Sequence, residues 1–92
     1  MKEKILRKKN QLTPDVNKHT LVLFNDDINT FSHVIKTLVE VCGHDPVQAE
    51  QCALIVHHKG SCEIKSGIRE ILTAMSRSLN AKGLTSKVIS VS

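Results

Sequence analysis

Three stretches with the signals of amphipathic helices, each followed by a glycine, limit the folds open to this 92-residue chain. The stretches cover residues 31–42, 46–59 and 68–79, and the glycines after them are Gly43, Gly60 and Gly83. Apolar residues three and four apart share one helix face, and glycine readily ends a helix. The chain therefore needs a second layer of structure that covers the apolar faces of three short helices.

Helix starts are marked by capping residues in two of these stretches. Thr30 precedes the first stretch and is expected to cap it. Asp45-Pro46 opens the second, with Asp as N-cap, Pro at the first helical position and Gln48 three residues after the cap. Ser66-Gly67 is expected to open the third helix, whose buried face would carry Ile68, Ile71, Leu72, Met75 and Leu79.

Short strand patterns lie before, between and after the helices. Thr20–Asn25 is apolar on both faces, Ser61–Lys65 alternates with Cys62 and Ile64 on one side, and Thr85–Val91 is rich in β-branched residues. The predicted order is strand, helix, helix, strand, helix, strand. We predict an α+β fold, a two-layer sandwich in which a three-stranded antiparallel sheet packs on three helices.

Charge divides the chain into two parts. Residues 1–18 hold six basic and two acidic residues, a net charge of +4, whereas residues 19–92 hold seven of each. We expect a flexible basic N-terminal extension at 1–18 and one domain at 19–92. The domain has no aromatic platform for nucleic acid and no apolar run long enough for a membrane. With no CxxC pair and no secretory signal, Cys42, Cys52 and Cys62 are expected to be reduced thiols of a cytoplasmic protein.

The stretch Asn25-Asp26-Asp27 places an amide and two carboxylates at the end of the first predicted strand. Adjacent carboxylates repel each other, and a buried carboxylate needs a partner. These residues either end the strand in a turn or bind a cation that is not part of the chain.

A histidine follows the apolar face of the second helix. Ala53, Val56 and His57 are spaced three and four apart, so His57 is expected to be half-buried, while His58 is turned by about 100°. From the spacing alone, a histidine that only fills the core is the better interpretation of His57, and a functional role is the alternative.

Together, Asn25-Asp26-Asp27 and the later Val56-His57, followed by His58-Lys59-Gly60, resemble the ClpS family of Clp protease adaptors. The likeness covers roughly residues 19–90. It implies a binding module, not an enzyme, that recognises proteins with a bulky apolar first residue (N-degron substrates). Such a module delivers them to a ClpA- or ClpC-like AAA+ unfoldase for proteolysis.

The resemblance assigns residues to two halves of a substrate site. Asn25, Asp26 and His57 would accept hydrogen bonds from the substrate α-amino group, which has N–H donors only. Asp27 would cap the following turn or hold the loop through its own backbone bonds, with Asn29 as a secondary contact. The apolar pocket for the first side chain maps onto Phe31, Val34, Ala53, Val56 and Leu84.

Some positions depart from the family pattern. Ile28, Asn29, Thr30 and Phe31 stand where an aromatic residue, Thr, Pro and Met are usual, and Ala53 replaces a second pocket Met. Glu70 matches one unfoldase-docking position, although it would also suit the first turn of a helix on electrostatic grounds alone. The family has a basic docking residue about five positions later, where this chain has Met75. The extension at 1–18 is expected to be engaged by the unfoldase pore.

Two other functions are compatible with parts of the sequence. A metal or enzymatic site built from Asp26, Cys52, His57 and His58 is disfavoured, because their directions on a helix diverge and no standard zinc spacing is present. We therefore expect no metal and no cofactor. A small interaction domain with the fold of the ribosomal stalk carboxyl-terminal domain, and a partner without a degron, is the alternative.

Overall fold

The computed structural model describes residues 19–90, which form three strands and three helices in the predicted order. The elements are β1 (His19–Phe24), α1 (Phe31–Cys42), α2 (Pro46–Lys59), β2 (Ser61–Gly67), α3 (Arg69–Ala81) and β3 (Thr85–Ser90). The expected extension at 1–18 and Val91, expected at the end of the last strand, lie outside the described residues.

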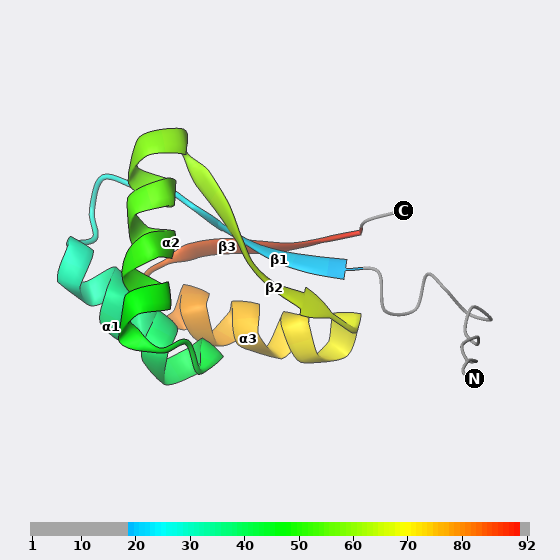
Figure 1. Ribbon diagram of the computed structural model, residues 1–92. Coiled ribbons are helices and arrows are strands. Elements are labelled where there is room, and N and C mark those ends of the chain that lie inside the picture. The colour runs from blue at the N-terminus through cyan, green and yellow to red at the C-terminus, as the bar shows by residue number, and fades with distance from the viewer. Residues whose placement is uncertain (1–18, 91–92) are drawn as a thin grey trace, which may run out of the picture.

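The sheet is antiparallel, with strand order β2-β1-β3, so the first strand is central. Leu21, Val22 and Leu23 of β1 are all buried, as expected for a central strand. In Figure 1, α3 runs below the strands, and α1 and α2 gather at the left-hand end. Helix α2 packs against β2, α3 packs against β1 and β3, and α1 packs against both other helices.

Both predicted helix caps are present. The Thr30 hydroxyl accepts a hydrogen bond from the backbone N–H of His33, and the Asp45 carboxylate accepts one from that of Gln48. Gly43 and Gly60 end α1 and α2 in the left-handed conformation that glycine adopts at least cost. Within residues 19–90, none of the helices has the length and apolar character needed to cross a membrane.

Helix α3 differs from the prediction at its start and on its buried face. Ser66 and Gly67 do not open the helix, because they continue β2 and pair with Thr20 and His19 of β1. Ile71 is 52% exposed, contrary to expectation. Leu72 and Leu79 are buried as predicted, and Ser76, which was not predicted, is buried with them.

A polar contact accounts for the burial of Ser76 on α3. The hydroxyls of Ser76 and Ser86 are 2.7 Å apart and buried between α3 and β3. The Asn80 side-chain oxygen accepts from the backbone N–H and the hydroxyl of Ser86, both at 3.0 Å. A serine can therefore occupy a buried helix position that apolar periodicity does not mark.

The cysteines belong to the core or its edge. Cys42 and Cys52 are buried, and Cys62 packs against the same cluster. Burial, together with a hydrogen bond to the Cys52 thiol, raises the pKa of the Cys62 thiol to about 12. Burial also raises the pKa of Cys42. Protonated thiols of this kind pack as small apolar groups and are poor nucleophiles.

A buried histidine forms a hydrogen bond to a β-bulge in the sheet. Leu21 pairs with Lys65 but Val22 pairs with Glu63, so Ile64 is the additional residue of a β-bulge. The carbonyl of Ile64 accepts a 3.0 Å hydrogen bond from Nε2 of His44, which is 7% exposed. His44 comes from the turn between α1 and α2 and thus ties that turn to the edge strand β2.

Replacing His44 with alanine is expected to lower the free energy of unfolding by about 1–2 kcal/mol, because the Ile64 carbonyl loses its donor. Urea denaturation measures the change. His58→Ala, which truncates an exposed histidine on α2, is the matched control and should stay within about 0.5 kcal/mol of the wild type. Equal stability of the two variants would contradict a structural role for His44.

Candidate functional site

The end of β1 and the end of α2 are held side by side by one backbone hydrogen bond. The N–H of Asn25, directly after β1, donates to the carbonyl of Gly60 at 2.9 Å. Gly60 ends α2 with a φ of 93°, and its own N–H donates to Val56. The left-handed turn at Gly60 therefore brings the polar end of β1 next to the last turn of α2.

A cavity of about 260 Å³ opens where these two ends meet. It is lined by Leu23, Phe24, Asn25, Asp26, Asp27, Asn29, Phe31, Val34, Ala53, Val56, His57 and Leu84. These include every residue that the sequence assigned to the amine and side-chain halves of a site. Leu23 and Phe24 were missed, although their position directly before Asn25 could have indicated them.

The cavity has an apolar floor and a polar side. Ala53, Val56 and Leu84 are buried, so they form the apolar floor. Phe31 is 40% exposed and lies nearer the mouth. Asp26 and Asp27 supply two carboxylates, and the described lining residues include no lysine or arginine. The arrangement suits a ligand with a positive charge next to an apolar group.

Asp26 holds the loop between β1 and α1. Its Oδ1 accepts from the backbone N–H of Ile28 at 3.0 Å and of Asn29 at 2.9 Å. The sequence assigned this loop-holding role to Asp27, but Asp26 is the residue that fills it, because its side chain turns back over the loop. Asp27 is exposed.

The environment of Asp26 favours its charged form. Partial burial raises the pKa of the carboxyl, but hydrogen bonds from the backbone and side chain of Asn29, from the backbone of Ile28, and the charge of His33 together outweigh it. The pKa of Asp26 therefore lies below its usual value. Oδ1 already accepts from Ile28 and Asn29, whereas among the described residues Oδ2 accepts only from the Asn29 amide, so a ligand N–H can add at Oδ2.

His57 lies at the mouth of the cavity and is exposed, whereas the sequence predicted a half-buried side chain. It belongs to the last turn of α2. Its ring meets that of Phe31 edge-on, with centroids 5.9 Å apart, and that of His58 at 5.2 Å.

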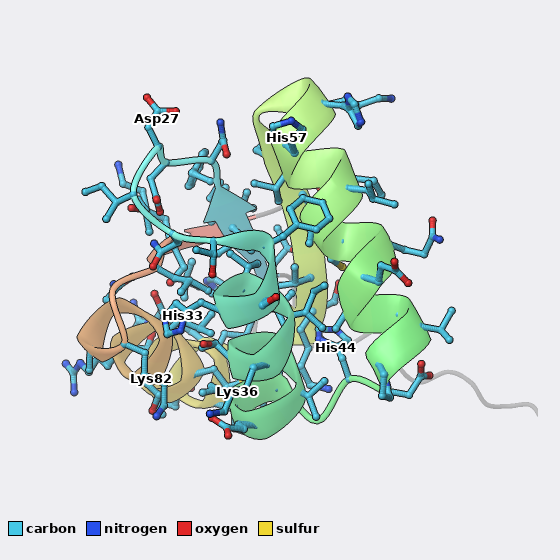
Figure 2. All side chains as sticks on the ribbon, turned by 90° about the vertical axis from the view of Figure 1, so that its left-hand side faces the viewer. Asp27, His33, Lys36, His44, His57 and Lys82 are labelled. Atoms are coloured by element: carbon cyan, nitrogen blue, oxygen red, sulfur yellow. The ribbon has the colours of Figure 1, made fainter. Side chains whose placement is uncertain are left out.

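The loop is also tied to the turn that follows α3. The side-chain amide of Asn29 donates to the Gly83 carbonyl at 2.8 Å, and Nε2 of His33 donates to the Lys82 carbonyl at 2.8 Å. Figure 2 shows His33 and Lys82 on the left of α1, and Asp27 and His57 above the start of that helix. This turn carries Leu84 into the cavity floor.

Glu70 lies apart from this cavity. It is in the first turn of α3 and borders a separate shallow hollow with Arg69, Thr73, Ala74 and Arg77. Among residues 19–90, no three or more His, Cys, Asp or Glu side chains are grouped closely enough to hold a metal ion.

Comparison with known proteins agrees with this architecture. The family model described as ATP-dependent Clp protease adaptor protein ClpS matches residues 14–87. The ATP-dependent Clp protease adapter protein ClpS of Streptomyces avermitilis is 34% identical over 71 residues, which covers 77% of this chain and 67% of that protein.

Among solved structures, ClpS2 of Agrobacterium tumefaciens bound to L-phenylalaninamide superimposes with a TM-score of 0.73 at 18% identity. The match covers 78% of this chain and 94% of that one. At this identity the superposition shows a shared fold, and the family model and the Streptomyces relative identify the family. The chain belongs to the ClpS family of adaptor proteins of the ATP-dependent Clp protease.

Proposed function

We propose that the chain binds the free α-amino group and bulky apolar first residue of N-degron proteins and delivers them to a Clp AAA+ unfoldase. The observation that carries the proposal is that hydrogen-bond acceptors and an apolar floor share one cavity. In this role the chain is an adaptor and performs no covalent chemistry.

The polar side of the cavity has the chemistry to hold an ammonium group. The ligand amine offers three N–H donors, and Asn25, Asp26 and His57 offer an amide oxygen, a carboxylate and a ring nitrogen. Hydrogen bonds that involve a charged group contribute about 1.5–3 kcal/mol each. The carboxyl end of α2, next to His57, adds the partial negative charge of a helix C-terminus.

The apolar floor has the chemistry to hold one side chain. Burying a Leu or Phe side chain is worth about 1.5–3 kcal/mol, and a cavity of about 260 Å³ is small compared with the usual drug-sized ligand pockets. Neither half alone gives useful affinity, whereas both together reach micromolar binding, roughly 8 kcal/mol. The bound L-phenylalaninamide of the Agrobacterium ClpS2 structure combines the same two groups.

The unfoldase is proposed to dock on α3. Glu70 lies beside Arg69 and Arg77 on an exposed part of this helix, away from the substrate cavity. Substrate and unfoldase can therefore bind at the same time.

A reconstituted degradation assay tests the delivery function. The full chain is added to a ClpA or ClpC unfoldase with its peptidase, together with a fluorescent reporter that begins with Leu or, as control, with Glu. We expect faster loss of fluorescence for the Leu reporter with one of the unfoldases and no change for the Glu reporter. Equal rates for the two reporters with both unfoldases would overturn the proposal.

A further inference from the structure

The side-chain amide of Asn29 lies between the two halves of the cavity. Its Nδ2 is 3.0 and 2.9 Å from the two carboxylate oxygens of Asp26 and 2.8 Å from the carbonyl oxygen of Gly83. An amide has only two N–H groups. One N–H is therefore shared between the carboxylate oxygens, and the other is donated to Gly83.

Each of these two contacts reaches a different part of the cavity. The Asp26 carboxylate belongs to the polar side, whereas Gly83 directly precedes Leu84, which is buried in the apolar floor. The backbone N–H of Asn29 also donates to Asp26. The position of the carboxylate is thus fixed relative to the floor through one side chain.

We infer that Asn29 is a positioning residue. It orients the Asp26 carboxylate toward the bound amine and fixes it relative to Leu84 in the apolar floor. The inference rests on the proposed function, because it assigns Asp26 to the amine. It explains how the polar loop and the apolar floor, which come from distant parts of the chain, keep a fixed position relative to each other. A pre-arranged acceptor binds more tightly because less ordering is needed on binding.

The pKa of Asp26 provides a test that is specific to this positioning role. The titratable groups near the carboxylate are Asp27 and His57, which line the same cavity, and His33 on α1, whose ring bonds the backbone of Lys82 in the turn after α3. Because the Asn29 amide stabilises the carboxylate form, its removal must raise the pKa of Asp26. Amine binding needs the carboxylate, so its loss on acidification would begin at a higher pH.

Three variants of the full chain separate positioning from folding. Asn29→Ala removes both contacts. Asn29→Thr keeps one hydroxyl donor for Asp26 but cannot serve Gly83 as well. Asn80→Ala is the matched control, because it removes two hydrogen bonds from the same turn without touching Asp26.

The measurements are the affinity for L-phenylalaninamide by calorimetry and the pKa of Asp26 from its carboxyl NMR shift. We expect Asn29→Ala to bind about tenfold more weakly and to titrate at higher pH, with Asn29→Thr intermediate in both. Asn80→Ala should leave both values unchanged while lowering the thermal stability.

An unchanged Asp26 pKa in Asn29→Ala, or equal loss of affinity in Asn80→Ala, would overturn the inference. Failure of the wild-type chain to bind L-phenylalaninamide would instead overturn the proposed function. In that case the pKa comparison still decides whether Asn29 orients the carboxylate. If Asn29→Ala does not fold, Asn29→Thr provides the same comparison.

Discussion

Replacing Asp26 and His57 together with alanine is expected to weaken binding of a peptide with a free apolar first residue by about a hundredfold to ten-thousandfold. Two charge-assisted hydrogen bonds are lost, each worth about 1.5–3 kcal/mol, and about 1.4 kcal/mol corresponds to a factor of ten. The remaining Asn25 amide and the apolar floor cannot hold the ligand alone. Fluorescence polarisation with a labelled peptide that begins with Phe measures the effect.

The control variant Asp45→Ala/His58→Ala removes the same two residue types outside the cavity lining. Asp45 caps α2 and His58 is exposed, so this control should lose some stability but keep its affinity. Asp26 also holds its loop, so the double variant can disturb the loop as well as the ligand contacts. His57→Ala alone is therefore measured too, because it breaks no hydrogen bond of the loop. Affinity within twofold of the wild type in the double Asp26/His57 variant would exclude amine binding at this site.

Filling the apolar floor is expected to abolish the preference for bulky first residues. Ala53 is buried and lines the cavity from α2, so Ala53→Phe places a large ring where the ligand side chain would lie. The ligand then loses up to about 3 kcal/mol of side-chain burial. Peptides that begin with Phe, Leu and Gly, compared by fluorescence polarisation, should bind the variant with similar, low affinity.

Ile55→Phe is the matched control, because Ile55 is on the same helix but 40% exposed and not part of the lining. This control should keep the wild-type preference for Phe over Gly. Thermal unfolding of both variants reports any strain from the added ring. A preserved preference in a folded Ala53→Phe variant would show that the first side chain binds elsewhere.

The sequence predicted the parts of the fold that depend on local interactions. Thr30 and Asp45 cap their helices through hydrogen bonds to residues three positions later in the sequence. Residue type and spacing were therefore sufficient to predict both caps. The end of β2 was not predictable in the same way, because Gly67 pairs with His19 across the sheet. His44 gave no periodic signal, since its role depends on a bulge at Ile64 in another element.

The candidate site shows the same division. The residues named from the resemblance line one cavity, together with Leu23 and Phe24, and their roles in binding stay predictions. The roles within the loop could not be predicted, because Asp26 and Asp27 are chemically identical and only the turn at Ile28 and Asn29 distinguishes them. That turn is tied to Gly83, 54 residues further along the chain, a contact that spacing cannot reveal.

The central claim is that the cavity binds a free α-amino group and an apolar side chain at once. Isothermal titration calorimetry of the full chain with L-phenylalaninamide and with N-acetyl-L-phenylalaninamide tests it directly, because acetylation removes the charge and two donors and leaves the ring unchanged. We predict one-to-one binding of the free amine and no detectable binding of the acetylated form. Equal affinity for the two compounds would contradict the account.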